Sequence, residues 1–173
     1  MAARDGTVTH SWTEVQSLAM RAARGADVPA AQASNFGNML TRHLADGRDE
    51  APLSEALKTQ GAIVDLALRV EKVIEAASIS SAPVSLSEDA PYLCALLVSW
   101  FNSLPCRTQV QLSGNTMTVT LSLSEPNARA RPARITLSAE FYAQMHDLAA
   151  NTYVPDSEAS RMGGAGAEQM GLD

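Results

Sequence analysis

The sequence predicts an α+β fold in which about five helices pack on one face of a small three-stranded antiparallel sheet. The first observation is the segment 115–123, where apolar residues alternate with Thr and Ser in the pattern of a half-buried strand. The second is the turn Ser113-Gly-Asn115, which joins this strand to the preceding segment 107–112 as a hairpin. The third is a set of five segments with apolar residues at helical spacing, which could cover the apolar face of such a sheet.

Boundary signals place the first two helices. Ser11-Trp-Thr-Glu14 is a capping box, so a helix begins here, and Gly25 is its expected left-handed stop. Pro29 opens a second helix that ends at Gly47. The two helices are expected to form an antiparallel hairpin.

Three more helices are predicted farther along the chain. A long helix spans 53–77, which Gly61 weakens or bends. A second capping box at Ser85 and Glu88 leads into a helix from about 89 to 103. Between Tyr92 and Phe101 this helix is apolar nearly all round, so it is either the central core helix or the seam of an oligomer. Ser138 caps a final helix that runs through residue 150.

The segment 133–137 is the third predicted strand. Sequential antiparallel pairing is the simplest topology, so the three strands are expected to form a meander after the long polar loop 125–132. Its outer face is expected to be polar because such faces meet water. That face would carry Gln109, Gln111, Thr118, Thr120, Arg134 and Thr136.

The domain organisation follows from where periodicity begins and ends. Residues 1–10 are expected to be a flexible N-terminal segment, and residues 11–154 form a single α+β domain. Residues 155–173 are rich in Gly and Ala and poor in large apolar side chains, which predicts a flexible tail.

Composition excludes several classes of partner. The net charge is −6 and the pI about 5.0, which argues against a nucleic-acid partner. The longest apolar run, 92–98, is too short to span a bilayer, and residues 1–10 lack the apolar core of a secretory signal. Two isolated cysteines form no disulfide framework. We expect a cytoplasmic protein that binds neither nucleic acid nor membrane.

No catalytic, metal or nucleotide motif stands out, so no cofactor is expected. The three histidines are scattered, and a grouping of His43 with nearby carboxylates is better explained as a solvated helix end. Cys106 beside Arg107 could be an activated nucleophile, but no histidine base is near in sequence. The run Gly163-Gly-Ala-Gly166 lacks the strand and helix that flank a phosphate-binding loop.

Both ends of the chain resemble a known family. The run SWTEVQSLAMRAARGA, residues 11–26, and the run TYVPDSEASRMGGAGA, residues 152–167, resemble the two ends of a bacterial family known only as a domain of unknown function. That resemblance implies no activity. The opening is also similar to the first helices of the malate/L-lactate dehydrogenase-like family, but that family continues into Ser-His-Gly where this chain reads Ala-Asp-Gly-Arg-Asp, residues 45–49.

Two functional hypotheses remain open. The first is a non-catalytic interaction or accessory protein that acts as a homodimer or with a partner enzyme, with a partner-binding surface made of Trp100, Phe101, Tyr153, Ser157 and Arg161. The second is an organic-anion-binding protein or small enzyme with a pocket between helices and sheet. Arg21, Arg24 or Arg134 would hold the anionic group.

Overall fold

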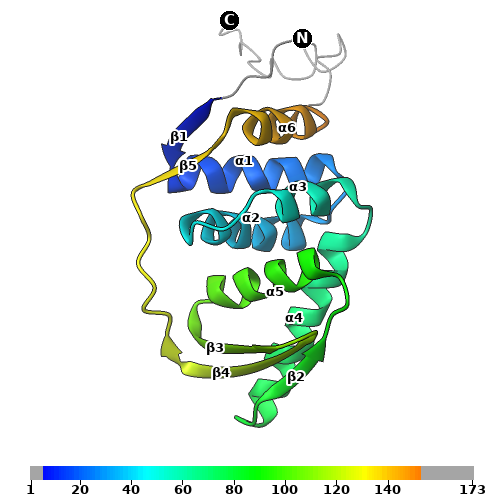
Figure 1. Ribbon diagram of the computed structural model, residues 1–173, viewed down its shortest axis with the longest axis vertical. Coiled ribbons are helices and arrows are strands. Elements are labelled where there is room, and N and C mark those ends of the chain that lie inside the picture. The colour runs from blue at the N-terminus through cyan, green and yellow to red at the C-terminus, as the bar shows by residue number, and fades with distance from the viewer. Residues whose placement is uncertain (1–5, 153–173) are drawn as a thin grey trace, which may run out of the picture.

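The computed structural model describes residues 6–152 as a layered α+β structure (Figure 1). The helices are α1 (Trp12–Gly25), α2 (Ala30–Ala45), α3 (Ala51–Lys58), α4 (Ala62–Ile79), α5 (Pro91–Ser103) and α6 (Ala139–Ala150). The strands are β1 (Thr7–Ser11), β2 (Val84–Ser87), β3 (Cys106–Ser113), β4 (Thr116–Pro126) and β5 (Arg134–Ser138). The α+β class and the antiparallel pairing are therefore confirmed.

The elements stack along the long axis of the molecule. From one end to the other, α6, α1, α2 and α5 lie side by side, and a three-stranded sheet closes the far end (Figure 1). Helix α4 packs against that sheet together with α5. A two-stranded ribbon of β1 and β5 lies at the opposite end, next to α6 (Figure 1). The prediction that about five helices pack on one face of a single sheet is thus wrong in detail. Helices α6 and α1 lie too far along the stack to cover the three-stranded sheet.

The predicted meander is also wrong in its third strand. The hairpin of β3 and β4 forms as expected, but the strand on the other side of β4 is β2, giving the order β2-β4-β3. Strand β5 pairs instead with β1, where Thr9 lies opposite Thr136. Residues 7–10, expected in a flexible segment, are therefore part of a strand. Arg134 and Thr136 consequently lie on the ribbon and not on the outer face of the larger sheet.

Two helix boundaries differ from the predictions for physical reasons. The long helix 53–77 is broken into α3 and α4, because Gly61 adopts a left-handed conformation with φ of 81°. The expected capping box at Ser85 and Glu88 is not one, because residues 84–87 pair with β4. Helix α5 begins at Pro91 instead, where proline suits the first turn. The capping box at Ser11 and Glu14 is confirmed.

The core lies between the helices and the inner face of the larger sheet. Leu96, Leu97 and Phe101 of α5 are fully buried, and Trp100 is 3% exposed. Met117, Val119 and Leu121 of β4 point into the same cluster. Helix α5 is therefore the central core helix, as one of the two interpretations of its apolar sequence proposed.

Candidate functional site

A cavity of about 380 Å³ opens on the side of the molecule where the segment after β4 crosses the helices. This segment, residues 127–133, runs in extended form from the larger sheet to β5 (Figure 1). Along its length it contacts the end of α5, the last turn of α2 and the start of α1. The cavity is lined by Trp12, Asn38, Arg42, Asn102, Ser103, Leu104, Pro105, Asn127, Arg129 and Arg131.

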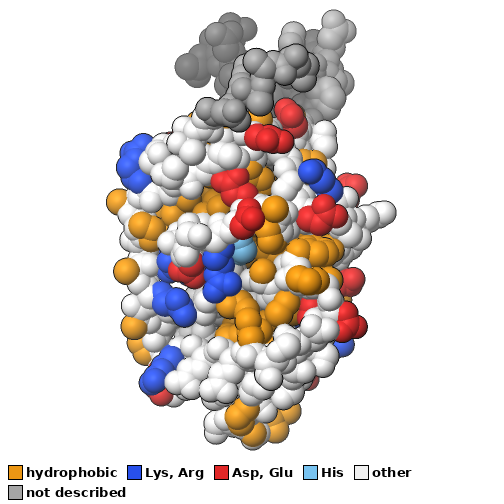
Figure 2. Space-filling view, in the orientation of Figure 1, with side chains coloured by type: hydrophobic (Ala, Val, Ile, Leu, Met, Phe, Trp, Pro, Cys, Tyr) orange, Lys and Arg blue, Asp and Glu red, His pale blue; other side chains and the backbone are white. Residues whose placement is uncertain are grey.

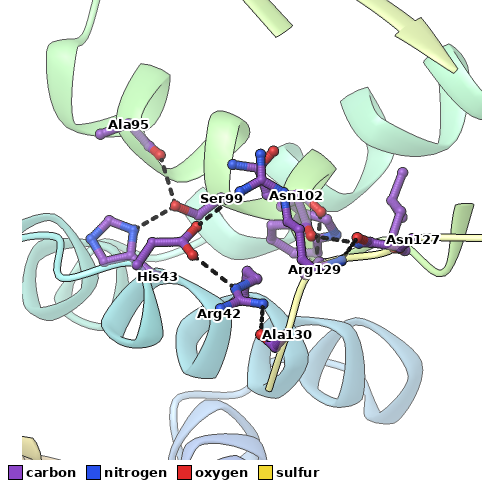
Figure 3. Close-up of polar contacts among 12 residues, drawn as sticks. Arg42, His43, Ala95, Ser99, Asn102, Asn127, Arg129 and Ala130 are labelled. Atoms are coloured by element: carbon purple, nitrogen blue, oxygen red, sulfur yellow. Dashed lines mark hydrogen bonds and ion pairs between the residues drawn. The ribbon is translucent and has the colours of Figure 1, made fainter. Parts of the chain in front are cut away.

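Asn127 fixes this segment to the end of α5. Its side-chain amide donates to the carbonyl oxygens of Asn102 at 2.9 Å and Leu104 at 2.7 Å. These carbonyls lie at a helix end, where they have no partner within the helix. The Oδ1 atom of Asn127 accepts from the backbone N–H of Arg129 at 2.9 Å, which turns the chain toward α2 (Figure 3).

Arg42 anchors the same segment from α2. It is only 6% exposed, and its Nη1 donates to the carbonyl of Ala130 at 2.8 Å. Its Nε lies 3.1 Å from Oδ1 of Asp46, one turn farther along α2 (Figure 3). The other carboxylate oxygen of Asp46 is 4.0 Å from Arg129. The free-energy cost of burying this cation is thus offset by an ion pair and by a hydrogen bond, as a buried charge requires.

Two guanidinium groups lie against the ring of Trp12. The Cζ atom of Arg42 is 5.4 Å from the ring centroid, and that of Arg131 is 5.5 Å from it. These are cation–π distances, so the indole helps to hold both cations near each other. The indole Nε1–H is buried and has no acceptor among the described residues. Such a buried donor without a partner costs free energy unless something outside the chain accepts from it.

Asn102 adds a second unused polar group. This residue of α5 is 4% exposed and lines the cavity, yet its side-chain amide forms no hydrogen bond with any residue between 6 and 152. Three guanidinium groups therefore line a cavity that also holds the buried, unpartnered indole N–H of Trp12, and the carboxylate of Asp46 lies near two of these groups from outside the lining. Figure 2 shows basic side chains gathered on the side of the molecule where residues 127–133 run.

A buried histidine lies close to this site but does not line it. The Nδ1 of His43 is 2.8 Å from the hydroxyl of Ser99 (Figure 3). Its Nε2 is 2.7 Å from the carbonyl oxygen of Asp49. A carbonyl only accepts, so Nε2 carries the proton, and Nδ1 of the neutral ring accepts from the Ser99 hydroxyl, whose single proton is shared with the carbonyl of Ala95 at 3.3 Å. Burial lowers the pKa of His43, which favours this neutral form. Because His43 and Ser99 are 1% and 0% exposed, the pair joins α2 to α5 and is closed to a substrate.

The arginines expected from the sequence do not meet. Arg24 donates to the carbonyl of Val28 beyond the end of α1, and Arg134 donates to the carbonyl of Thr9 in the β1–β5 ribbon. Arg134 pairs with Ser11 at the start of α1, so the length of this helix, about 20 Å, separates it from Arg24. Arg21 lines a different hollow, between α1 and α6. The structure therefore does not bring all three arginines to one place, and an anion-binding role for any one of them stays a prediction.

The structure describes two of the five residues expected at a partner surface, Trp100 and Phe101. Trp100 and Phe101 are 3% and 0% exposed, so they pack in the core of the single chain and offer no surface to a partner. Tyr153, Ser157 and Arg161, with the whole predicted tail 155–173, lie outside the described residues. Residues 1–5 lie outside them as well.

Neither a metal site nor a nucleophilic Cys106, the two alternatives considered from the sequence, gains support from the described residues. Within the described part of the chain, no three His, Cys, Asp or Glu side chains are grouped so that they could hold a metal ion. Burial raises the pKa of the Cys106 thiol, which disfavours the nucleophilic thiolate. No helix of residues 6–152 has both the length and the apolar character needed to cross a membrane.

Sequence reasoning missed the residues that line the cavity. From the sequence, neither Trp12 nor Arg42 received a functional role. The sequence feature that could have pointed to this cavity is the Arg129-Ala-Arg131 spacing, in a segment bounded by Pro126 and Pro132. That spacing alone did not say which helices the segment would cross.

Comparison with known proteins gave no match to a family model, to a curated protein or to a solved structure. The resemblance of the two chain ends to a bacterial family of unknown function therefore stays a prediction.

Proposed function

We propose that this protein binds a small anion, one that carries a phosphate or at least two carboxylate oxygens, in the cavity between α1, α2, α5 and residues 127–131. The observation that carries the proposal is the buried Arg42, flanked by Arg129 and Arg131; among residues 6–152, Asp46 is the carboxylate that pairs with Arg42 and Arg129. Guanidinium groups bind such oxygens through paired, charge-assisted hydrogen bonds. The free donors of Trp12 and Asn102 would complete the shell.

The size and lining of the cavity support binding of a small molecule. Its volume of about 380 Å³ lies at the lower end of ligand pockets in general. No Asp, Glu, His or Cys side chain is among the described residues that line it, so the lining offers no general base. The proposal is therefore a binding function and not a reaction.

Thermal unfolding in the presence of inorganic phosphate or succinate tests the proposal. Methylammonium chloride at equal ionic strength serves as the control. A ligand at about 100 times its Kd stabilises the folded chain by about 2.7 kcal/mol, which raises Tm by roughly 5 to 10 °C at this size. We expect at least one of the two anions to produce such a shift.

Paired substitutions locate the binding. Arg129→Gln with Arg131→Gln should abolish the shift, because both side chains are exposed and replaceable without loss of the fold. Arg24→Gln with Arg134→Gln removes the same charge elsewhere and should leave the shift unchanged. Equal shifts in both double variants, or none in the wild type, would overturn the proposal.

The expectation of an interaction or accessory protein is kept as a second proposal. Because Trp100 and Phe101 are buried, a homodimer or a partner would use another surface. A cytoplasmic location belongs to the same proposal and is supported by the two free thiols, Cys94 and Cys106.

A further inference from the structure

A second hollow, of about 790 Å³, lies away from the cavity of Arg42. It is bounded by α6 on one side and by α3 with the turn into α4 on the other, and the end of α1 closes it. Gln144 of α6 holds the two walls together, because it accepts from the hydroxyl of Ser54 at 2.6 Å and donates to its carbonyl at 3.3 Å. We call this hollow the α3–α6 groove.

The floor of the α3–α6 groove is apolar. Val28, Leu57 and Ile63 line it and are at most 5% exposed, and Leu148 adds a partly exposed side chain. Those three side chains have little surface left to cover, so the partly exposed Leu148 is where an apolar side chain of a partner would gain free energy.

The rim of the groove is acidic. Asp27, Glu140 and Asp147 are exposed, and none of their side chains has an ion-pair or hydrogen-bond partner among residues 6–152. Lys58 is the one cation in the lining. Figure 2 shows acidic side chains over the end of the molecule where α3 and α6 lie. Three carboxylates against one ammonium leave the rim with excess negative charge.

The spacing of the carboxylates suits an extended chain. Glu140 and Asp147 are seven residues apart on α6, so they lie on one face about 10 Å from each other. A segment in the extended polyproline II conformation, which has three residues per turn, covers that distance in three residues at about 3.1 Å each. Side chains at positions i and i+3 of such a segment lie on one face, so basic residues there would reach both carboxylates, and an apolar side chain between them would reach the floor.

We propose that the α3–α6 groove binds a basic, extended segment of a partner protein with the pattern basic-apolar-apolar-basic. The net charge of −6 on the whole chain favours encounter with such a partner and disfavours a second copy of this chain. The groove shares no lining residue with the cavity of Arg42, so the proposal stands independently of the anion site.

Fluorescence anisotropy with labelled peptides tests this inference on the full chain. The probe is a nine-residue peptide with Arg-Leu-Val-Arg at its centre and Gly and Ser at its ends. Two control peptides carry Gln-Leu-Val-Gln or Arg-Ser-Ser-Arg in its place. We expect saturable binding of the probe at low salt, and at least tenfold weaker binding of each control.

Matched variants of the protein assign the binding to the groove. The triple variant Asp27→Asn, Glu140→Gln and Asp147→Asn should weaken binding at least tenfold. The triple variant Glu71→Gln, Glu75→Gln and Asp89→Asn changes the net charge equally at exposed positions elsewhere and should have little effect. The chain has two lysines, so Lys58→Gln should strengthen binding severalfold, whereas Lys72→Gln should not.

Other occupants predict different outcomes, each of which overturns the proposal. A small organic amine as the true ligand would appear as spermidine binding as tightly as the probe, with the same dependence on Asp27, Glu140 and Asp147. A second copy would appear as self-association in light scattering that the same three substitutions remove. Equal weakening by both triple variants would mean that only net charge matters.

Discussion

Single residues at close approaches fix how the helices of this protein pack. Gly25 was expected to stop α1 in a left-handed conformation, but it is the last helical residue, and the positive φ of 63° belongs to Asp27. A Cβ at position 25 would lie 1.7 Å from the carbonyl oxygen of Leu148 in α6. Glycine is therefore needed there because another helix backbone occupies the space of a side chain. At Gly37 of α2 the corresponding distance, to the carbonyl of Gln16, is 2.8 Å.

We predict that Gly25→Ala lowers the free energy of unfolding by about 2 kcal/mol or more, since overpacking against backbone typically costs about 1–3 kcal/mol. Gly37→Ala should cost less because its clash is smaller. Urea denaturation of both variants measures the difference. Alanine is the better helix former by about 1 kcal/mol, so a stabilised Gly25→Ala variant would show that α6 does not pack this closely.

The buried His43 couples stability to pH. Its pKa is lowered from 6.5 by burial, so the unfolded chain takes up a proton at a pH where the folded chain does not. Stability is then fully present above pH 6.5 and falls as the pH drops below it. The pKa of Glu88 is also lowered from 4.5, by hydrogen bonds from backbone amides and by Arg69, but its contribution is lost only at lower pH.

We predict that the free energy of unfolding decreases between pH 7 and pH 5.5, by at most about 1.4 kcal/mol per pH unit from this one group. His43→Gln should flatten that slope, whatever it does to the stability at pH 7. His146→Gln alters an exposed histidine and should preserve the slope. Chemical denaturation at half-unit pH steps provides the measurement, and an unchanged slope in His43→Gln would contradict the prediction.

Among the elements, α5 and the α3–α4 break show what local sequence leaves open. The apolar sequence of α5 suited both a core helix and an oligomer seam, and burial of Leu96, Leu97 and Phe101 decides for the core. The segment 53–77 has helical periodicity on both sides of Gly61, yet the chain turns there because α3 packs on α5 while α4 continues to the larger sheet.

We predict that Trp100→Glu unfolds the chain, because a carboxylate at a position 3% exposed would be buried without a partner. Loss of a cooperative unfolding transition in circular dichroism would show this. Trp100→Phe keeps an apolar ring and should remain folded. A folded, monodisperse Trp100→Glu monomer beside a dimeric wild type would instead restore the seam hypothesis.

We predict that Gly61→Ala costs about 1–2 kcal/mol, which is the penalty for an L-residue in a left-handed conformation. Nothing lies within 4 Å of a Cβ at this position, so the cost would come from the backbone alone. The neighbouring exposed substitution Gln60→Ala is the control. A neutral Gly61→Ala variant would imply that α3 and α4 can join in one helix.

At the scale of the molecule, two hollows of opposite character lie at different places in the stack. The cavity of Arg42 is basic, and the α3–α6 groove is acidic with an apolar floor. They share no lining residue. Both depend on α1, whose first residue lies at one site and whose end closes the other.

We predict that the two sites bind independently. Saturating phosphate should change the affinity for the Arg-Leu-Val-Arg peptide by less than about twofold, since reciprocal coupling needs a shared two-state element. Peptide titrations with phosphate and with chloride at equal ionic strength measure this. A larger change would show that ligand binding at one site alters the other through α1.

The sequence alone determined the features that depend on neighbours in the chain. The capping box at Ser11, the β3–β4 hairpin at Gly114 and the apolar character of α5 all follow from interactions over a few residues. Such local interactions are written directly in residue order, so the α+β class could be predicted.

Only the tertiary structure decided the pairing of β5 with β1 and the site beneath residues 127–133. Thr9 and Thr136 are 127 residues apart, and Arg42 and Ala130 are 88 apart. Several strands could have offered β5 a hydrogen-bonding edge, and several helices could have packed under the segment after β4. Which of them did so depends on burying the whole core at once, and no local pattern of residues records that outcome.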